Sequence, residues 1–182
     1  MSIRNSPMRC IPAAIVTASL FWLGGCAAPA PLNYAPSSVL SATGAVKVAN
    51  FVYTPAVSGK VEPNQIRNTA IGSVIVDQNI DNFFRDAVFK ELRFVGVKTD
   101  SENVVLTGDI KEFLIDDLGY SVDWTLIVDY TVKNNGVAVY TAEKTTKRHT
   151  AKFVNVFGAL NETVKVNIEE IIKDPAFSKA IN

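Results

Sequence analysis

The fold is decided by residues 120–136, which read YSVDWTLIVDYTVKNNG. From Val122 to Val132 every second residue is apolar, and the residues between them are polar apart from Ile127. This period of two is typical of a β-strand in an antiparallel sheet, with one face packed and the other face in water. Asn135 and Gly136 accept the positive φ angles of a type I′ turn, so the chain is expected to return as a further strand.

Two more strands are expected on the N-terminal side of this hairpin. Residues 39–54 are rich in β-forming side chains, and Pro55 stops the run. In residues 104–116 the apolar alternation changes parity near Lys111, which predicts a β-bulge or a switch of the buried face there. Residues 55–68 contain two prolines, a glycine and many polar side chains, and we interpret them as a long loop that is functional, or else as a solvated excursion or a poorly ordered hairpin. Residues 71–76 are interpreted as a short strand or as the approach to the next helix.

Residues 77–95 and 153–173 are the predicted helices. In both ranges apolar side chains recur at steps of three and four, which gives one stripe that can pack on a sheet. Gly96 stands where a helix commonly ends in a left-handed residue. Asp174 and Pro175 suit the cap and the first position of a further short helical turn.

The order of these elements predicts the fold class. Strand, helix, three meandering strands and helix give a single α+β domain over residues 39–182. We expect an antiparallel four-stranded sheet with both helices packed on one face (β-α-β-β-β-α) and the other face exposed to water. The sequence contains no internal repeat that would divide it, and its length suits one domain.

The first 25 residues have the layout of a secretory signal peptide. Arg4 and Arg9 precede an apolar run that is shorter than the roughly 20 residues of a membrane-spanning helix. The run leads into Leu-Gly-Gly-Cys at residues 23–26, which resembles the lipobox of bacterial lipoproteins. The resemblance implies that residues 1–25 are removed and that Cys26 carries a diacylglycerol group and a further acyl chain. The residues recognised by the signal peptidase would be Leu23, Gly24 and Gly25.

The residues after Cys26 bear on localisation. Ala27 and Ala28 lack the aspartate that retains lipoproteins in the inner membrane of enterobacteria, so the resemblance implies an outer-membrane anchor and a periplasmic domain. Residues 26–38 hold three prolines and no periodicity, and we interpret them as an extended spacer between the lipid and the domain. The alternative is an ordinary secreted protein in which Cys26 is a free thiol.

Composition excludes several classes of function. Without residues 1–25 the chain has two more acidic than basic side chains, so it lacks the basic excess that favours nucleic acid. Cys10 leaves with the leader and Cys26 takes the lipid, so no disulfide is expected. His149 is the single histidine, which excludes a zinc site of the Cys/His type. We expect neither a metal nor a cofactor.

Two motifs resemble a known group of proteins. They are residues 106–113, which read LTGDIKEF, and residues 133–140, which read KNNGVAVY, together with the alternating strand between them. The group is a broad set of envelope lipoproteins that includes auxiliary lipoproteins of ABC-type transport systems and YajG-type lipoproteins. The lipopolysaccharide-assembly lipoprotein of the outer membrane has a comparable layout. The similarity covers about residues 79–173 and implies a non-enzymatic subunit of envelope transport or assembly.

Few residues are candidates for catalysis. His149 lies at a polar strand end with no acidic residue nearby in sequence, so we interpret it as solvated. Asp116 and Asp117 fit a turn. Asp123 and Asp129 share one face of a strand but lie ~20 Å apart, too far to flank one glycosidic bond. We therefore do not expect an enzyme.

A basic cluster near the end of the last strand is the strongest local charge feature. It would attract anionic lipid headgroups or an acidic partner, or else protect a sheet edge from aggregation. Its members are Lys144, Lys147, Arg148 and Lys152.

Taken together, these features predict a membrane-anchored envelope lipoprotein that acts as a non-enzymatic binding or accessory subunit in envelope transport or assembly. The lipid would fix the domain at the membrane, and the exposed sheet face or a sheet edge would bind an envelope protein. Two alternatives stay open. One is a carrier that holds a lipid or another apolar ligand between sheet and helices, and the other is a cell-wall-acting hydrolase.

Overall fold

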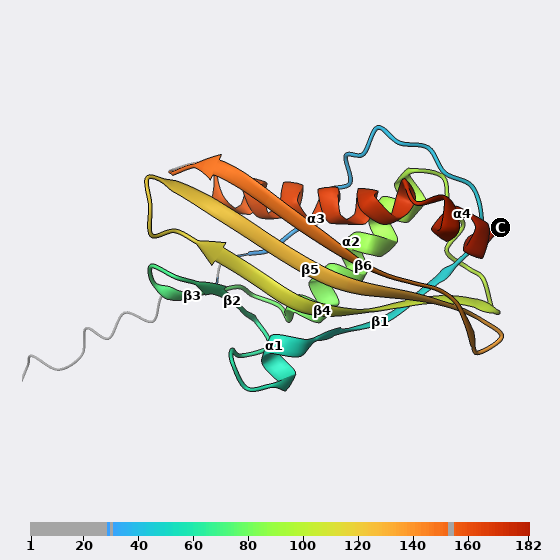
Figure 1. Cartoon of the computed structure of the whole chain (residues 1–182), viewed down its shortest axis with the longest axis horizontal. Coiled ribbons are helices and arrows are strands. Elements are labelled where there is room, and N and C mark those ends of the chain that lie inside the picture. Colours follow the sequence, from blue (N-terminus) through green and yellow to red (C-terminus); the bar gives the residue numbers. More distant parts are fainter. Residues whose placement is uncertain (1–28, 30, 153–154) are drawn as a thin grey trace, which may run out of the picture.

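The computed structural model describes residues 29, 31–152 and 155–182, and within them a mixed α+β domain (Figure 1). The predicted signal peptide and Cys26 lie outside these residues. The strands are β1 (Lys47–Tyr53), β2 (Gln65–Asn68), β3 (Gly72–Ile75), β4 (Val104–Asp116), β5 (Ser121–Asn134) and β6 (Val137–Ala151). The helices are α1 (Thr54–Val57), α2 (Ile80–Phe94), α3 (Val156–Ile172) and α4 (Pro175–Ile181). None of the helices in these ranges is long and apolar enough to cross a membrane.

The β5–β6 hairpin and β4 form the centre of the sheet, as predicted. Asn135 (φ 49°) and Gly136 (φ 83°) make the expected left-handed turn between β5 and β6. β4 pairs antiparallel with β5, and the register shifts between Ile110 and Glu112, which confirms the bulge predicted near Lys111. One face of β5 is buried along its whole length. Its buried side chains are Val122, Trp124, Leu126, Val128, Tyr130 and Val132.

The part of the sheet beyond β4 differs from the expected antiparallel arrangement. The strand order is β3-β2-β4-β5-β6, and β1 also pairs with β4. Both β1 and β2 run parallel to β4, β1 along residues 105–110 and β2 at Leu114 and Ile115. The prediction of four antiparallel strands and two helices is therefore matched only in part, because in the described residues the sheet is mixed and has six strands accompanied by four helices.

Two predicted segments account for this difference. The predicted loop at residues 55–68 contains most of α1, a single helical turn, and also β2, which pairs with β3 in a short hairpin. Strands of four residues are too short to show a period of two. The predicted strand at residues 39–54 starts only at Lys47, because the chain before it is irregular and its backbone bonds to the end of α2 at Val95 and to Lys98 instead of to β4.

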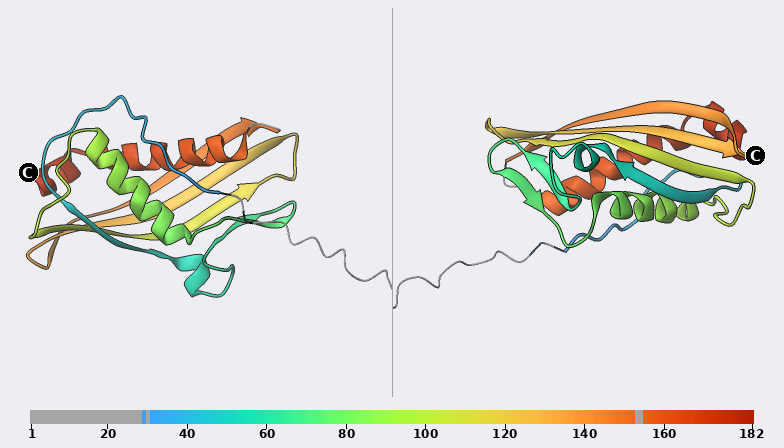
Figure 2. Two further views of the ribbon diagram at one scale, coloured as in Figure 1. Left: turned by 180° about the vertical axis from the view of Figure 1, so that it is seen from behind. Right: turned by 90° about the horizontal axis from the view of Figure 1, so that it is seen from below.

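The helices α2 and α3 lie on one face of the sheet, as expected (Figure 2). In the described part of the chain, the opposite face carries no helix. Gly96 follows α2 with a φ of 104°, which confirms the predicted end of that helix. Asp174 caps α4, since its side chain accepts a hydrogen bond from Ala176 N at 2.9 Å. The buried side chains of the sheet and the helices form a single apolar core.

Aromatic residues fill the core where β1, β4, β5 and α2 meet. The ring of Phe51 lies 5.4 Å from that of Phe84 and 6.0 Å from that of Tyr130, between centroids. The same ring covers the backbone of β4 at Gly108, where a Cβ atom would overlap it. That Cβ atom would also come within 2.9 Å of Asp129 O. Glycine in the Leu-x-Gly-x-Ile motif therefore makes room for the aromatic ring of β1.

The Gly108→Ala variant is expected to lower the free energy of unfolding by about 1 to 3 kcal/mol, because the added methyl group displaces Phe51 or shifts β1. Urea unfolding followed by the fluorescence of Trp124 measures this change. The matched control is Gly119→Ala in the β4–β5 turn, where the nearest atoms lie 3.9 Å from a Cβ position. Equal stabilities of the two variants would contradict the close contact.

Candidate functional site

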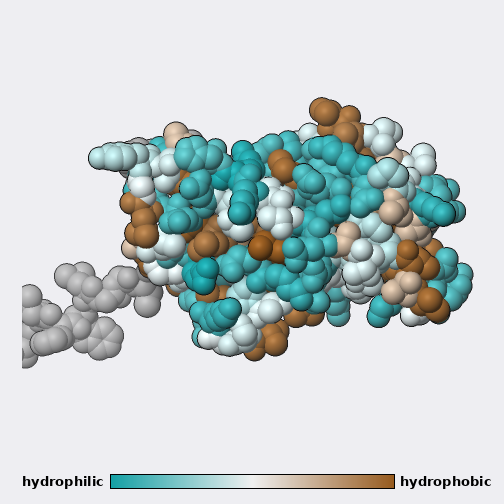
Figure 3. Space-filling view, viewed as in Figure 1, coloured by the Kyte–Doolittle hydropathy of each residue, from teal (hydrophilic) through white to brown (hydrophobic). Residues whose placement is uncertain are grey.

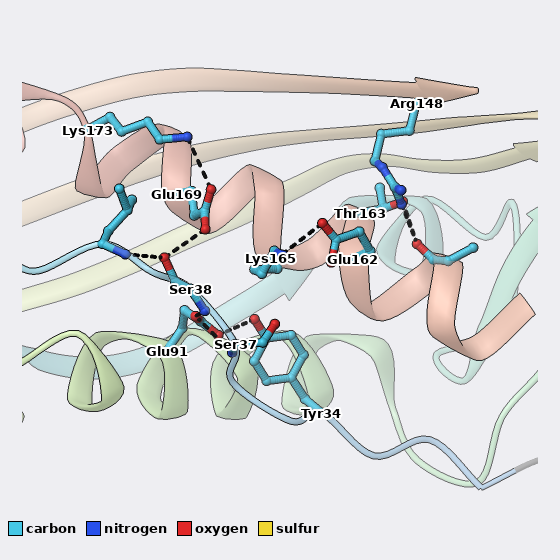
Figure 4. Close-up of polar contacts among 12 residues, drawn as sticks. Tyr34, Ser37, Ser38, Glu91, Arg148, Glu162, Thr163, Lys165, Glu169 and Lys173 are labelled. Atoms are coloured by element: carbon cyan, nitrogen blue, oxygen red, sulfur yellow. Dashed lines mark hydrogen bonds and ion pairs between the residues drawn. The ribbon is translucent and has the colours of Figure 1, made fainter. Parts of the chain in front are cut away.

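The N-terminal part of the described chain packs against the helices. Residues 31–44, which we call the strap, have no regular secondary structure and run along α2 and α3 (Figure 4). Leu32 and Tyr34 are buried and belong to the core. The interpretation of residues 26–38 as an extended spacer is therefore wrong from Leu32 onwards, because the side chains of Leu32 and Tyr34 pack into the core of the domain.

Hydrogen bonds fix the strap at both ends of α2. Before the start of the helix, Leu32 N donates to Asp77 Oδ1 at 3.0 Å. After its end, Ala42 N donates to Val95 O at 2.8 Å. The strap thus follows α2 over its whole length, and it cannot swing away as a free linker would.

A buried carboxylate of α2 holds the middle of the strap. Glu91 is fully buried (0% exposed), and its side chain accepts hydrogen bonds from the Tyr34 hydroxyl and from the backbone N–H groups of Ser37 (3.3 Å) and Ser38 (2.7 Å). Burial, and next the Glu91 carboxylate, raise the pKa of Tyr34 well above its usual value, so this hydroxyl stays a donor. Because a buried carboxylate without donors costs several kcal/mol, the strap and α2 stabilise each other.

Ser38 also links the strap to α3. Its hydroxyl donates to Glu169 Oε1 at 2.7 Å, and Lys173 Nζ lies 3.1 Å from Glu169 Oε2 (Figure 4). Partial burial raises the pKa of Glu169, but the hydrogen bonds from Ser38 and Lys173 outweigh this effect and hold the pKa below its usual value. Two glutamates on different helices, Glu91 and Glu169, therefore meet at one strap residue.

The face of the sheet opposite the helices is exposed and carries both acidic and basic side chains, and we call it the open face. The cross-strand register aligns Asp109, Asp129 and Glu143 in one row over β4, β5 and β6. The Lys111 ammonium group lies between two of them, 3.9 Å from Asp109 Oδ2 and 3.2 Å from Asp129 Oδ2. Ile127 adds an apolar side chain to a neighbouring row. Further residues of the open face are Asp123, Thr125, Thr145, Lys147 and His149.

The predicted basic cluster does not form one surface. Lys144 and Arg148 point toward the helices, because alternate residues of a strand face opposite sides. Lys144 Nζ lies 2.8 Å from Asp174 Oδ2, and Arg148 Nη1 donates to a carbonyl of α3 at 3.0 Å. Lys147 is on the open face, and Lys152 Nζ contacts the β4–β5 turn. The structure does not bring these four cations together. Each lies in a different environment, so they do not form a basic patch.

His149 has an acidic partner that sequence reasoning missed. Its Nδ1 lies 2.8 Å from Asp123 Oδ1, across the β5–β6 pair. This pairing depends on a register shift between Val132 and Lys133, which moves the rest of β5 by one position against β6. Both side chains are about two-thirds exposed (68% and 64%), which is typical of a solvated pair rather than of a shielded catalytic base. Asp129 lies farther along the same face, as the alternation predicted.

No family model matches the chain, and no curated protein sequence matches it. Among solved structures, protein XCC0632 from Xanthomonas campestris, described with the family model DUF330, is similar with a TM-score of 0.62 and 13% identity. The match covers 81% of this chain and 93% of that one. An uncharacterized protein (TM-score 0.41, 10% identity, 84% and 94% covered) and a PelC dodecamer from Paraburkholderia phytofirmans (TM-score 0.39, 13% identity, 74% and 90% covered) are more distant. At this identity the similarity to XCC0632 shows the fold alone.

Removal of the Tyr34 hydroxyl tests the contact with Glu91. The Tyr34→Phe variant keeps the ring, which packs edge-on against Phe83 with centroids 6.4 Å apart, but it withdraws one donor from a buried carboxylate. We expect a loss of about 1.5 to 3 kcal/mol in the free energy of unfolding and faster hydrogen exchange at the Ser38 amide. Tyr120→Phe, at an exposed tyrosine, should change neither quantity. Unchanged exchange in the strap of Tyr34→Phe would contradict the proposed role of the hydroxyl.

Asp174 provides a contact that depends on pH. The hydrogen bond from Lys144 is the main cause that lowers the pKa of Asp174 from 3.8 to about 2, against the opposing effect of burial. The Ala176 amide and the Tyr140 hydroxyl lower it further. Since the pKa is lower in the folded chain than in the unfolded chain, this carboxylate stabilises the fold above about pH 4. The contribution is lost as the pH falls toward 2.

The Asp174→Asn variant removes this charge but keeps a side chain that can cap α4. At pH 7 we expect its free energy of unfolding to be about 1 to 2 kcal/mol below that of the unmodified chain, after allowance for solvent screening. The difference should shrink toward zero near pH 2. Chemical unfolding across this pH range measures it, and a difference that is constant with pH would show that the ion pair does not contribute.

Proposed function

We propose that this chain is a membrane-anchored envelope lipoprotein whose domain acts as a non-enzymatic binding or accessory subunit in envelope transport or assembly. Cys26 would carry the lipid in the outer membrane, and the domain would lie in the periplasm. Support for the anchor comes from the Leu-Gly-Gly-Cys motif at residues 23–26 and the leader before it.

The observation that carries the proposal is that hydrogen bonds and buried side chains fix the strap against the helices. Cys26 stands six positions before Leu32, and six extended residues reach at most about 20 Å. Because Leu32 is buried and bonded to Asp77, a lipid on Cys26 would hold the whole domain close to the membrane and limit its orientations. This arrangement suits a protein that presents one surface at a fixed height above a membrane.

The open face is the surface that we expect a partner to bind. The helices cover the other side of the sheet (Figure 2), while this side offers hydrogen-bonding and charged groups around Ile127. The row formed by Asp109, Asp129 and Glu143 favours a partner with basic residues, since complementary charge speeds association and selects the partner. The proposed partner is therefore an envelope protein with a basic surface.

The two alternatives require features that differ from those observed. A carrier needs a cavity between sheet and helices, whereas in the described residues the buried apolar side chains of this layer form one cluster. The hollows of about 340 to 420 Å³ that the described residues line lie at the surface, at the end of α2, on the open face and beside α1. A hydrolase needs paired acids in a cleft, whereas Asp109 and Asp129 lie on exposed strands with Lys111 between them.

Site-specific photo-cross-linking in living cells tests the proposal. A photoreactive amino acid at Ile127 should capture one envelope protein in stoichiometric yield when the tagged chain is purified from membranes. The same probe at Glu170, on the exposed side of α3, is the matched control and should not capture it. In a Cys26→Ala form, which stays off the membrane, the yield at Ile127 should fall.

Charge reversal adds a second readout. Glu143→Lys on the open face is expected to lower the yield of the cross-linked product several-fold, whereas Glu170→Lys leaves it unchanged. Both glutamates are exposed, so neither change threatens the fold. If no protein is captured and a lipid or a glycan co-purifies instead, the proposal fails in favour of the carrier or the hydrolase.

A further inference from the structure

One end of the domain gathers several loops and the start of the strap. The β4–β5 turn, the tip of the β2–β3 hairpin and the start of α3 lie at this end, on the left in Figure 1. Leu32 is bonded to Asp77 just before α2, and Asn161 in the first half of α3 donates to Asn33 O at 2.8 Å. From there the strap runs away from this end toward Ala42. The residues that precede Leu32 are therefore attached near the loop end.

Large apolar side chains are exposed on these loops. Ile71 at the hairpin tip and Leu118 and Tyr120 in the β4–β5 turn are 73%, 73% and 102% exposed, and we call these three residues the apolar tip. Figure 3 shows hydrophobic atoms at this end of the domain. Single exposed apolar residues are common, but a group on adjoining loops is typical of a contact surface.

Polar contacts brace the two loops against each other. Thr69 Oγ1 donates to Asp116 Oδ1 at 2.8 Å and accepts a hydrogen bond from Asp117 N at 2.9 Å. Lys152 Nζ donates to Gly119 O at 3.1 Å and lies 3.2 Å from Asp117 Oδ1. The apolar tip is therefore presented on a fixed support, and its side chains cannot easily fold back onto the domain.

We propose that the apolar tip is a lipid-contacting surface, at which Ile71, Leu118 and Tyr120 enter the headgroup region of the membrane. This inference rests on the proposed lipid at Cys26. Leu32 stands six positions after Cys26, a reach of at most about 20 Å, so with the lipid in place the loop end would lie near the membrane surface. The apolar side chains of Ile71 and Leu118 are stabilised when they leave water for the edge of the hydrocarbon. Tyrosine favours the boundary between hydrocarbon and water, because one end of its side chain is apolar and the other is polar.

This contact would hold the domain upright on the membrane. β5 has 14 residues, which span about 45 Å at the usual rise of ~3.3 Å per residue. The β5–β6 turn and the exposed Val137 therefore lie at the end far from the apolar tip. The open face would then stand at a steep angle to the membrane and be accessible along its whole height.

Spin labels at the two ends test the inference in the full lipidated chain. Cys10 leaves with the leader and Cys26 carries the lipid, so an introduced cysteine is the single free thiol. Tyr120→Cys and the matched exposed site Val137→Cys are labelled with a nitroxide and reconstituted into phospholipid vesicles. At Tyr120→Cys we expect several-fold fewer collisions with a water-soluble nickel complex than at Val137→Cys, and more collisions with oxygen, which concentrates in the bilayer.

Three results would overturn the inference, each in a distinguishable way. Equal nickel collision rates at the two sites would show that the apolar tip stays in water. Lower rates for both nickel and oxygen at Tyr120→Cys would show a protein contact instead of a lipid contact. Mass spectrometry of the purified chain precedes labelling, and an unmodified Cys26 would overturn the proposed anchor together with this inference, whereas the first two results leave the anchor standing.

Discussion

A buried carboxylate, that of Glu91, is the constraint on which the N-terminal half of the structure depends. A charge at this depth needs hydrogen-bond donors, and the N–H groups of α2 are used within the helix. The donors come instead from Tyr34, Ser37 and Ser38, about fifty residues earlier in the chain. The strap and α2 depend on each other, because release of the strap would leave the Glu91 carboxylate buried without hydrogen-bond donors. The strap, residues 31–44, is therefore part of the folded domain and is not a flexible linker.

The second organising contact is the ring of Phe51 on the backbone at Gly108, which joins the chain after the strap to the central strand β4. β1 is parallel to β4 because the chain between them passes through α2, and a strand, a helix and a strand in that order usually give a parallel pair. The predicted order of strand, helix and strand therefore already indicated that the first two predicted strands are parallel. The antiparallel expectation extended the pattern of the β5–β6 hairpin to a region where a helix intervenes.

Sequence reasoning succeeded where a pattern is long and failed where an element is short or its partner is distant. The period of β5, the stripe of α2 and the turn at Gly136 are local features, and they were predicted. β2 has four residues, too few for a period, and the burial of Leu32 has no local sign in a Pro-rich stretch. The opposite orientations of Lys144 and Lys147 follow from simple alternation and could have been predicted. The contact of His149 with Asp123 depends on a register shift that the sequence does not reveal.

The short segment between Cys26 and Leu32 and the row of acidic residues on the open face together restrict what the proposed anchor can do. A long flexible linker would let the domain search a large volume, and it would raise the effective concentration of a membrane partner only modestly. A strap that is fixed from Leu32 onwards limits the search to a thin layer next to the membrane. Within that layer the row of Asp109, Asp129 and Glu143 would favour a partner with basic residues. The proposed partner would therefore carry its basic surface within reach of the open face, at a height that the length of β5 sets.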